Sequence, residues 1–334
     1  MAEVVTLGEC MVSFIAGSRG PLAGSETFLR VIAGAEANLA VGLARLGHEV
    51  AYVGRVGDDA WGTAIRRTLR GEGVDVRRLV TDPGAPTGVM MRELRDVGPM
   101  EVIYHRAGSA ASRTGADDVR AAIDAGCFEG VRWVHLTGIT PALSASAAAA
   151  VEAAIDAGRE RGATVSLDLN IRRRLWDEAT AAATLRRLLA RCDVVLGGLD
   201  ESALVAGLAP SLEAAVGLDP VVVGDALLAL GPSRALVKVG ADGVVERVAG
   251  PDGAKVTRRA AGVPARVADP VGAGDAFDAA WLAYTLEGRD PVLALRAGNA
   301  AGAAVVATVG DQAGLPTHRE LDAILAAGGP DTIR

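Results

Sequence analysis

The chain has 334 residues, of which 50% are hydrophobic, and it carries a formal net charge of -7 from 34 basic and 41 acidic side chains. This length accommodates one large α/β domain or two smaller ones. The acidic balance argues against a nucleic-acid-binding surface. Cys10, Cys127 and Cys192 are too few and too dispersed for a disulfide framework or a zinc cluster. With no signal peptide or membrane span in the pattern, we expect a cytoplasmic protein without membrane partners.

The first part of the chain alternates short apolar segments with segments of helical period. Strands are predicted at residues 3–7, 48–56 and 74–80. Helices are predicted at residues 39–46 and after Gly57-Asp58-Asp59, where an aspartate suits the position that caps a helix. Such alternation is typical of a parallel sheet whose strands are joined by right-handed helical crossovers.

Residues 87–106 follow a different pattern. Apolar side chains recur there at two-residue spacing around Gly98-Pro99, which predicts an antiparallel hairpin. Residues 10–15 and 28–32 are also extended in pattern, with a turn-rich loop predicted at residues 17–24. We therefore expect a small separate sheet, inserted at about residues 10–33 and 86–107, that acts as a lid on the larger sheet.

The remaining chain continues the alternation of strands and helices. Helices are predicted at residues 113–128, 144–161, 184–190, 201–207, 276–286 and 291–309. Strands are predicted at residues 133–137, 164–169, 193–196 and 235–239, with a hairpin at 244–249 and 255–259. Residues 210–231 give no readable pattern. No linker or repeat interrupts the chain, so residues 1–334 are expected to form a single α/β domain.

Residues 268–277, ADPVGAGDAF, stand where a turn opens a predicted helix. Unpaired backbone N–H groups and the helix dipole favour an anion at such a place. Gly272 and Gly274 would let the backbone approach that anion closely. Asp275 would be repelled by an anion unless it removes a proton, which predicts phosphoryl transfer to a hydroxyl. An ordinary helix start with an acid in its first turn has the same local pattern.

With its flanks, this motif resembles the carboxy-terminal signature of the ribokinase-like (PfkB) carbohydrate kinases, and the resemblance runs with gaps from Leu7 to about Glu320. It implies a ribokinase-like three-layer sandwich with a mostly parallel central sheet and a small β-sheet lid. It also implies that Asp275 is the catalytic base and that Gly272, Ala273 and Gly274 form the anion hole. The implied cofactors are ATP, Mg²⁺ and a monovalent cation, and the implied assembly is a homodimer formed through the lid sheets.

The resemblance also implies which residues bind the sugar. Gly34 and Asn38 match the glycine and asparagine of a segment that touches the sugar in the family, although Ala33 replaces its first glycine. Asn38 equally suits a helix start. The Asp269-Pro270-Val271-Gly272 variant is most similar to the 2-keto-3-deoxygluconate kinases within the family.

Two arginines point to an acidic sugar. Tyr104 and Arg106 resemble the Tyr-x-Arg segment that binds the acid sugar in 2-keto-3-deoxygluconate kinases, whereas Met90 stands where that group often has a tyrosine. Arg172 would be a second positive group at the same end. A guanidinium can bind a carboxylate through two parallel hydrogen bonds, but an arginine is also ordinary on an exposed edge strand.

The nucleotide end is predicted from residues that follow strands, where ligands bind in open α/β sheets. Asp168 and Asn170 resemble an Asp-x-Asn-x-Arg stretch that orients phosphate and the waters of magnesium. Glu201 matches the glutamate of an Asn-x-x-Glu motif with an indirect role at magnesium, but Gly198 replaces the asparagine. A plain acid at a helix start is the alternative interpretation of Glu201.

A second segment completes the predicted nucleotide site. Lys238, Gly240 and Gly243 follow a strand and form a tight turn, similar to a family segment near the phosphates and ribose of ATP. Asn299 lies on a predicted helix and borders the adenine in the family, although the small residues around it also fit helix packing alone.

The sequence thus predicts an ATP-dependent kinase that phosphorylates the primary hydroxyl of 2-keto-3-deoxygluconate or a similar sugar acid. A kinase for a neutral sugar such as fructose or ribose is the nearest alternative. A sugar-responsive binding protein without turnover is the alternative of another class, and Asp275 argues against it. Neither a P-loop nor a Gly-x-Gly-x-x-Gly after the first strand is present, which argues against a P-loop nucleotide site and a dinucleotide oxidoreductase.

Overall fold

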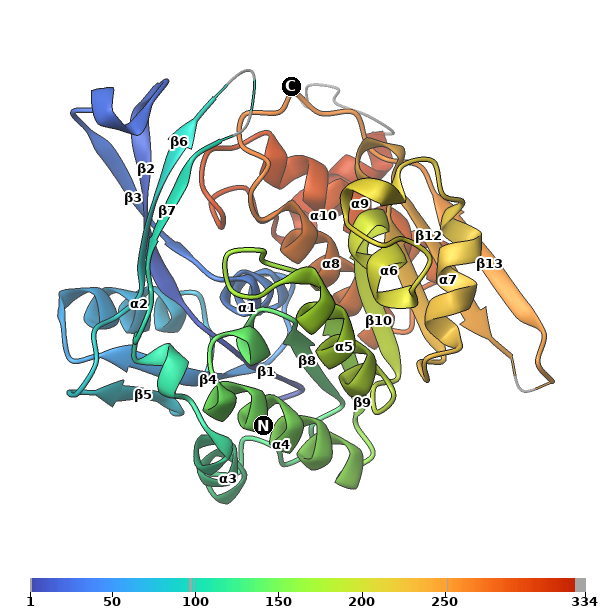
Figure 1. Ribbon diagram of the computed structural model, residues 1–334, viewed down its shortest axis with the longest axis horizontal. Helices are drawn as coiled ribbons and strands as arrows, with labels where there is room; N and C mark the ends of the chain where they lie inside the picture. The colour runs from blue at the N-terminus through green and yellow to red at the C-terminus, as the bar shows by residue number, and fades with distance from the viewer. Residues whose placement is uncertain (1, 96–97, 99, 251, 328–334) are drawn as a thin grey trace.

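The computed structural model describes residues 2–95, 98, 100–250 and 252–327. Within these residues, nine strands form one sheet in the order β13-β12-β11-β10-β9-β8-β1-β4-β5, and four form a second sheet in the order β3-β2-β6-β7. Helices cover both faces of the large sheet, and the small sheet stands at one end of it (Figure 1). The predicted three-layer α/β fold with a mostly parallel central sheet is confirmed.

The large sheet is buried on both faces. Its strands are β1 (Val4–Leu7), β4 (Val50–Gly57), β5 (Leu79–Asp82), β8 (Trp133–Thr137), β9 (Thr164–Asp168), β10 (Val194–Gly198), β11 (Arg234–Lys238), β12 (Val244–Ala249) and β13 (Lys255–Ala260). Neighbours from β5 to β11 pair parallel, and β12 and β13 add an antiparallel hairpin. Val194 and Leu196 join one hydrophobic cluster and Val195 the other, which is the alternation that a strand covered on both sides requires.

Two groups of helices provide these two hydrophobic clusters. One group comprises α1 (Ala35–Arg45), α2 (Ala60–Gly71), α8 (Ala273–Leu286), α9 (Pro291–Val306) and α10 (His318–Ala327). The other comprises α3 (Ala116–Asp124), α4 (Ala145–Glu160), α5 (Glu178–Leu189), α6 (Leu199–Ala206) and α7 (Pro220–Leu228). Asp59 caps α2 as predicted, because its carboxylate accepts a bond from Gly62 N. Among the described residues, no helix has the length and apolar character needed to cross a membrane.

The small sheet consists of β2 (Met11–Arg19), β3 (Phe28–Ala33), β6 (Val89–Leu94) and β7 (Val102–His105). The predicted hairpin is confirmed, since β6 and β7 pair antiparallel; Pro99 of its predicted turn lies outside the described residues. Phe28, Leu29 and Ile103 of this sheet are exposed. The movement of the sheet as a lid, and its use as a dimer surface, stay predictions.

Several predicted boundaries are wrong. The strand expected at residues 74–80 begins only at Leu79, and before it Asp75 forms an isolated bridge and accepts a bond from Arg77 N in a local turn. Strand β2 runs on to Arg19 through part of the expected loop. Helices α1 and α5 begin four and six residues earlier than predicted, and the unreadable stretch 210–231 contains α7, which Asp219 caps.

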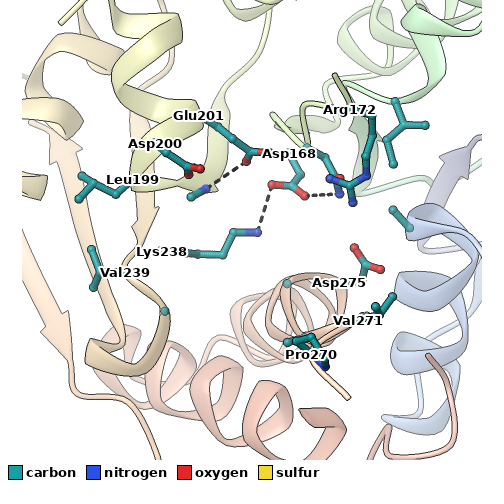
Figure 2. Close-up of a pocket in the computed structure, with 18 of the residues that line it drawn as sticks. Asp168, Arg172, Leu199, Asp200, Glu201, Lys238, Val239, Pro270, Val271 and Asp275 are labelled. Carbon is teal, nitrogen blue, oxygen red and sulfur yellow. Dashed lines mark hydrogen bonds and ion pairs between the residues drawn. The ribbon is translucent and has the colours of Figure 1, made fainter. Parts of the chain in front are cut away.

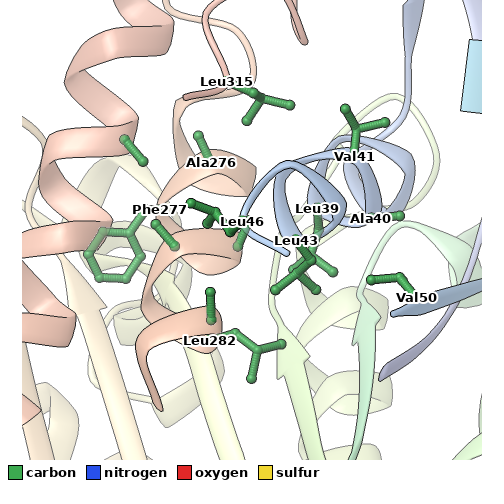
Figure 3. Close-up of a cluster of buried hydrophobic side chains, with 14 of the residues drawn as sticks. Leu39, Ala40, Val41, Leu43, Leu46, Val50, Ala276, Phe277, Leu282 and Leu315 are labelled. Atoms are coloured by element: carbon green, nitrogen blue, oxygen red, sulfur yellow. The ribbon is translucent and has the colours of Figure 1, made fainter. Parts of the chain in front are cut away.

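Helices α1 and α8 lie against each other over the centre of the large sheet. Leu43 of α1 and Phe277 of α8 belong to the same buried cluster (Figure 3). A side-chain carbon at Gly42 would lie 2.7 Å from Ala279 Cβ, so the two helix backbones approach closely only because residue 42 is glycine. This packing brings the first turns of both helices to the same edge of the sheet.

Candidate active site

A cavity of about 1250 Å³ opens between the small sheet and the carboxyl ends of the parallel strands. Residues that follow β1, β8, β9, β10 and β11 line it. The strand order reverses direction between β1 and β8, because the chain first builds β4 and β5 on one side and then β8 onwards on the other. Ligands of open α/β sheets bind at such a reversal.

All but two of the predicted site residues line this cavity. They are Gly34, Asn38, Tyr104, Arg106, Asp168, Asn170, Arg172, Glu201, Lys238, Gly240, Gly272, Ala273, Gly274 and Asp275. Gly243 and Asn299 do not line it. The Asn299 amide donates to the carbonyl oxygens of Ala260 (3.0 Å) and Ala261 (2.9 Å), which themselves line the wall, so Asn299 supports the wall from behind.

Residues 270–274, which lead into α8 and include its first two residues, are called the anion-hole loop here. Gly272 has a φ of 86°, a left-handed conformation that favours glycine. A side-chain carbon there would also come within 2.9 Å of the Asp311 carbonyl oxygen. A Cβ at Gly274 would lie 3.5 Å from Lys238 Nζ, an ordinary van der Waals distance, so this position faces the lysine across the cavity. The loop therefore presents bare backbone at the start of α8, where an anion is favoured.

Asp275 lies in the first turn of α8 and points into the cavity (Figure 2). Its Oδ2 accepts a hydrogen bond from Asn38 Nδ2 over 2.8 Å, which holds the carboxylate in place. Burial raises the pKa of Asp275 to about 6, Asp168 adds to the rise, and the Asn38 bond, Arg172 and Lys238 oppose it. The group is therefore ionised at neutral pH and more basic than an ordinary aspartate, as a general base requires.

This pKa predicts how the rate depends on pH. Because only the ionised Asp275 can accept a proton, kcat/KM should rise with pH and level off above an apparent pKa of about 6. Burial also raises the pKa of Glu36 and Glu201 to about 7. The apparent pKa of the rate profile therefore belongs to the interacting carboxylates together and not to Asp275 alone. Initial rates from pH 5 to 8 test this, with preincubation at each pH as the control for inactivation. A flat profile would contradict the assignment.

Lys238 forms a buried ionic cluster with two aspartates. Its Nζ lies 3.1 Å from Asp168 Oδ1 and 3.1 Å from Asp278 Oδ1 (Figure 2 shows the first pair). Burial opposes the charge of Lys238, but the two carboxylates outweigh that effect and raise the pKa of Lys238 above its usual range. Asp278 was not predicted as a site residue, although its position three residues after Asp275 on one helix face was a signal.

Asn170 and Glu201 shape the loop that follows β9. Asn170 has a φ of 39° and its amide donates to Asp168 Oδ2 over 3.0 Å. Glu201 Oε1 accepts from Ile171 N over 2.7 Å and its Oε2 from Gly198 N over 3.3 Å. Both oxygens of Glu201 are thus occupied by backbone donors, as in the alternative interpretation of an acid at a helix start.

Arg106 is buried rather than exposed, which rules out the edge-strand alternative. It forms an ion pair with Glu9, and its guanidinium carbon lies 5.4 Å from the centre of the Tyr104 ring. Glu9 Oε1 also accepts from Ser109 Oγ over 2.7 Å. Met90 lies opposite Tyr104 in the β6–β7 pairing, on the facing strand as expected from the sequence. Glu9 was not predicted as a site residue, although a polar residue just after a buried parallel strand was a signal.

The chain resembles known carbohydrate kinases over almost its whole length. The model of the pfkB family carbohydrate kinase matches residues 1–318. The 2-dehydro-3-deoxygluconokinase of Bacillus subtilis (strain 168) is 35% identical over 97% of this chain and 96% of its own length. The enzyme of the same name from Thermoproteus tenax is 37% identical over 98% of this chain and 95% of its own length.

Solved structures of carbohydrate kinases also resemble this chain. A PfkB protein from Polaromonas sp. JS666 is 34% identical, covers 97% of this chain and 100% of its own, and has a TM-score of 0.83. The 2-dehydro-3-deoxygluconokinase of Thermotoga maritima is 25% identical, covers 97% of this chain and 98% of its own, and has a TM-score of 0.82. Nothing in these relatives supports a binding protein or an oxidoreductase. The chain therefore belongs to the pfkB family of carbohydrate kinases, phosphotransferases with an alcohol group as acceptor.

Proposed function

We propose that this kinase phosphorylates the primary hydroxyl of 2-keto-3-deoxygluconate (2-dehydro-3-deoxygluconate) or a similar sugar acid, with ATP as the donor. The observation that carries the proposal is the buried Arg106, stacked on Tyr104 in the cavity wall, with Arg172 lining the same cavity. A guanidinium binds a carboxylate through directional, charge-assisted hydrogen bonds. The names of the two near-full-length relatives support the same substrate.

Asp275 is the base in this proposal. It accepts the proton of the hydroxyl while Asn38 holds its other oxygen, Oδ2, in place. When bound, ATP supplies the γ-phosphoryl group. The backbone N–H groups of residues 272–274 and the start of α8 stabilise negative charge on that group as it moves.

The residues at the other end of the cavity fit a nucleotide with magnesium. Lys238 supplies positive charge, and Gly240, Ala260 and Ala261 leave room along the wall. No cluster of three or more metal-ligating side chains occurs in the part of the chain that the structure describes. Mg²⁺ commonly binds through one or two carboxylates together with substrate phosphates, and Asp168 is a carboxylate that lines the cavity.

Two solved relatives are described with such ligands. A putative ribokinase II of Escherichia coli, 25% identical with a TM-score of 0.86, is described in complex with ATP and Mg²⁺. A double mutant of a fructokinase of Vibrio cholerae O395, 26% identical with a TM-score of 0.82, is described with fructose, ADP and potassium ion bound. These descriptions support ATP and Mg²⁺ as ligands of this chain and raise a monovalent cation as a third.

A kinase for a neutral sugar is the second candidate, and Glu9 favours it. Because Glu9 pairs with Arg106, this part of the wall has no net charge without a substrate. Met90 lacks the hydroxyl that a tyrosine would add. A fructokinase of Escherichia coli is 36% identical over 62% of this chain.

Arg106→Ala separates the two candidates. Loss of a charge-assisted hydrogen bond, worth roughly 1.5–3 kcal/mol, should raise the KM for the sugar acid about tenfold or more and leave the KM for a neutral sugar little changed. The measurement is ADP release in a coupled assay over 2-keto-3-deoxygluconate, fructose and ribose. Arg174→Ala is the matched control, since Arg174 is exposed and binds the carbonyl oxygen of Val102 on β7. Equal damage for acidic and neutral sugars would make Arg106 a packing residue and favour the neutral-sugar kinase.

A further inference from the structure

Arg92 of strand β6 reaches from the small sheet to the base of the anion-hole loop. Its side chain is 1% exposed. The guanidinium binds Asp269 through two parallel bonds, Nη1 to Oδ1 at 2.8 Å and Nη2 to Oδ2 at 2.6 Å. Nη2 also donates to Asp311 Oδ1 over 3.0 Å. One cation therefore joins two carboxylates that are 177 and 219 positions away in the sequence.

These two aspartates frame the anion-hole loop. Asp269 directly precedes the loop, and its carboxylate accepts bonds from Val271 N (3.2 Å) and Gly310 N (3.0 Å). The backbone of Asp311 lies against Gly272, because a Cβ placed at residue 272 would lie only 2.9 Å from the carbonyl oxygen of Asp311. The position of the loop therefore depends on the two carboxylates staying where they are.

The same segment reaches the base. Gln312, next to Asp311, donates from Nε2 to Asn38 Oδ1 over 3.1 Å, and Asn38 in turn donates to Asp275. A shift of Asp311 would thus move both the anion-hole loop and the residue that orients the catalytic carboxylate. Displacements of about 1 Å at such positions can cost 10²-fold in rate.

Two buried carboxylates side by side require a positive charge. Asp269 is 0% and Asp311 2% exposed, so water does not screen their repulsion. Without Arg92, this place would attract a cation from solution. The guanidinium of Arg92 supplies this positive charge, because it stays protonated at all working pH values and its planar group forms two parallel hydrogen bonds with the Asp269 carboxylate.

We propose that Arg92 is a positioning residue that serves as the resident cation of the anion-hole loop, so that turnover by this kinase requires no monovalent cation from solution. The proposal runs against the expectation of a monovalent cofactor. It rests on the kinase activity of the family and holds for any sugar that the enzyme accepts, so its failure is distinct from the failure of the proposed sugar-acid substrate.

The wild-type enzyme provides the first test. Initial rates with ATP, Mg²⁺ and the best sugar of the panel are measured in potassium, sodium and tetramethylammonium chloride at constant ionic strength. The proposal predicts rates that agree within about twofold, since no solution cation occupies the place of the Arg92 guanidinium. Activation by potassium beyond that range overturns it.

The second test removes the resident cation. Arg92→Ala should lower kcat about 10²-fold with a smaller change in KM for the sugar, and added guanidinium chloride at tens of millimolar should restore part of kcat whereas tetramethylammonium should not. Arg95→Ala is the matched control, because Arg95 on the same chain segment pairs with Glu93 and does not contact the loop. Wild-type kcat in Arg92→Ala, or a loss that guanidinium leaves unchanged, overturns the proposal.

Nucleotide binding gives a readout that is independent of turnover. Calorimetric titration of Arg92→Ala with ADP in the absence of sugar should show weakened binding that guanidinium strengthens, since the loop that contacts phosphate is then displaced. Unchanged ADP affinity contradicts the link between Arg92 and the loop. If Arg92→Ala does not fold, Arg92→Lys is measured instead for the dependence of its turnover on potassium. The lysine keeps the charge and should keep turnover independent of potassium, and potassium activation of this variant overturns the proposal.

Discussion

Asp275→Asn should fold as the wild type does and lose about 10²–10⁴-fold in turnover, the usual effect of removing a general base. The amide has nearly the same shape, and its oxygen still accepts the bond from Asn38, so the geometry of the site persists. What the amide cannot do is accept the proton of the sugar hydroxyl. Steady-state rates with every accepted sugar test this, with Asp156→Asn, an exposed ion-pair partner of Arg191, as the control.

The same variant has a predictable effect on stability. The pKa of Asp275 is about 6 in the folded protein against 3.8 for an ordinary aspartate. Between these values the folded state binds more protons, so the contribution of this group to stability is present below pH 3.8 and is lost as pH rises through 6. Asp275→Asn should therefore melt at or above the wild-type temperature at pH 8. A variant with near wild-type kcat would refute Asp275 as the base.

Much of the fold could be predicted because its signals are local. A buried parallel strand such as β10 is a short apolar run, and the two-residue spacing in β6 and β7 identified the small sheet. The boundaries were less accurate where a cap decided them. Helix α1 begins after Gly34, whose φ of 137° a pattern of apolar residues does not reveal.

The candidate site was predictable where a residue follows a strand or belongs to a recognisable segment, as Asp168, Lys238 and Asp275 do. It was not predictable where the function of a residue depends on a distant partner. The pair of Arg92 and Asp269 joins a strand of the small sheet to a loop 177 positions later, and no spacing indicates it. Likewise, Arg106 alone suggested a positive pocket, and only the fold shows Glu9 beside it.

The two lysines of the chain, Lys238 and Lys255, provide a matched pair of variants. Lys238→Met should lower the free energy of unfolding by about 3–5 kcal/mol, because it leaves Asp168 and Asp278 buried without their counter-ion. Lys255→Met should change it by less than about 1 kcal/mol, since Lys255 is exposed and its pair with Asp225 spans 3.6 Å at the surface. Denaturant unfolding of both variants at pH 6 and pH 8 provides the comparison.

The pH dependence distinguishes loss of a counter-ion from loss of packing. Burial already raises the pKa of Asp278 well above its usual range, with Lys238 opposing the rise. Without that lysine, the folded state should take up a proton here, so the stability of Lys238→Met should fall as pH rises from 6 to 8 relative to wild type. The pKa of Asp275 should also rise, because Lys238 lowers it, and the acidic limb of the rate profile should move to higher pH. A destabilisation that is the same at both pH values would instead assign the role of Lys238 to the packing of its side chain, whose Nζ lies 6.0 Å from the centre of the Phe277 ring.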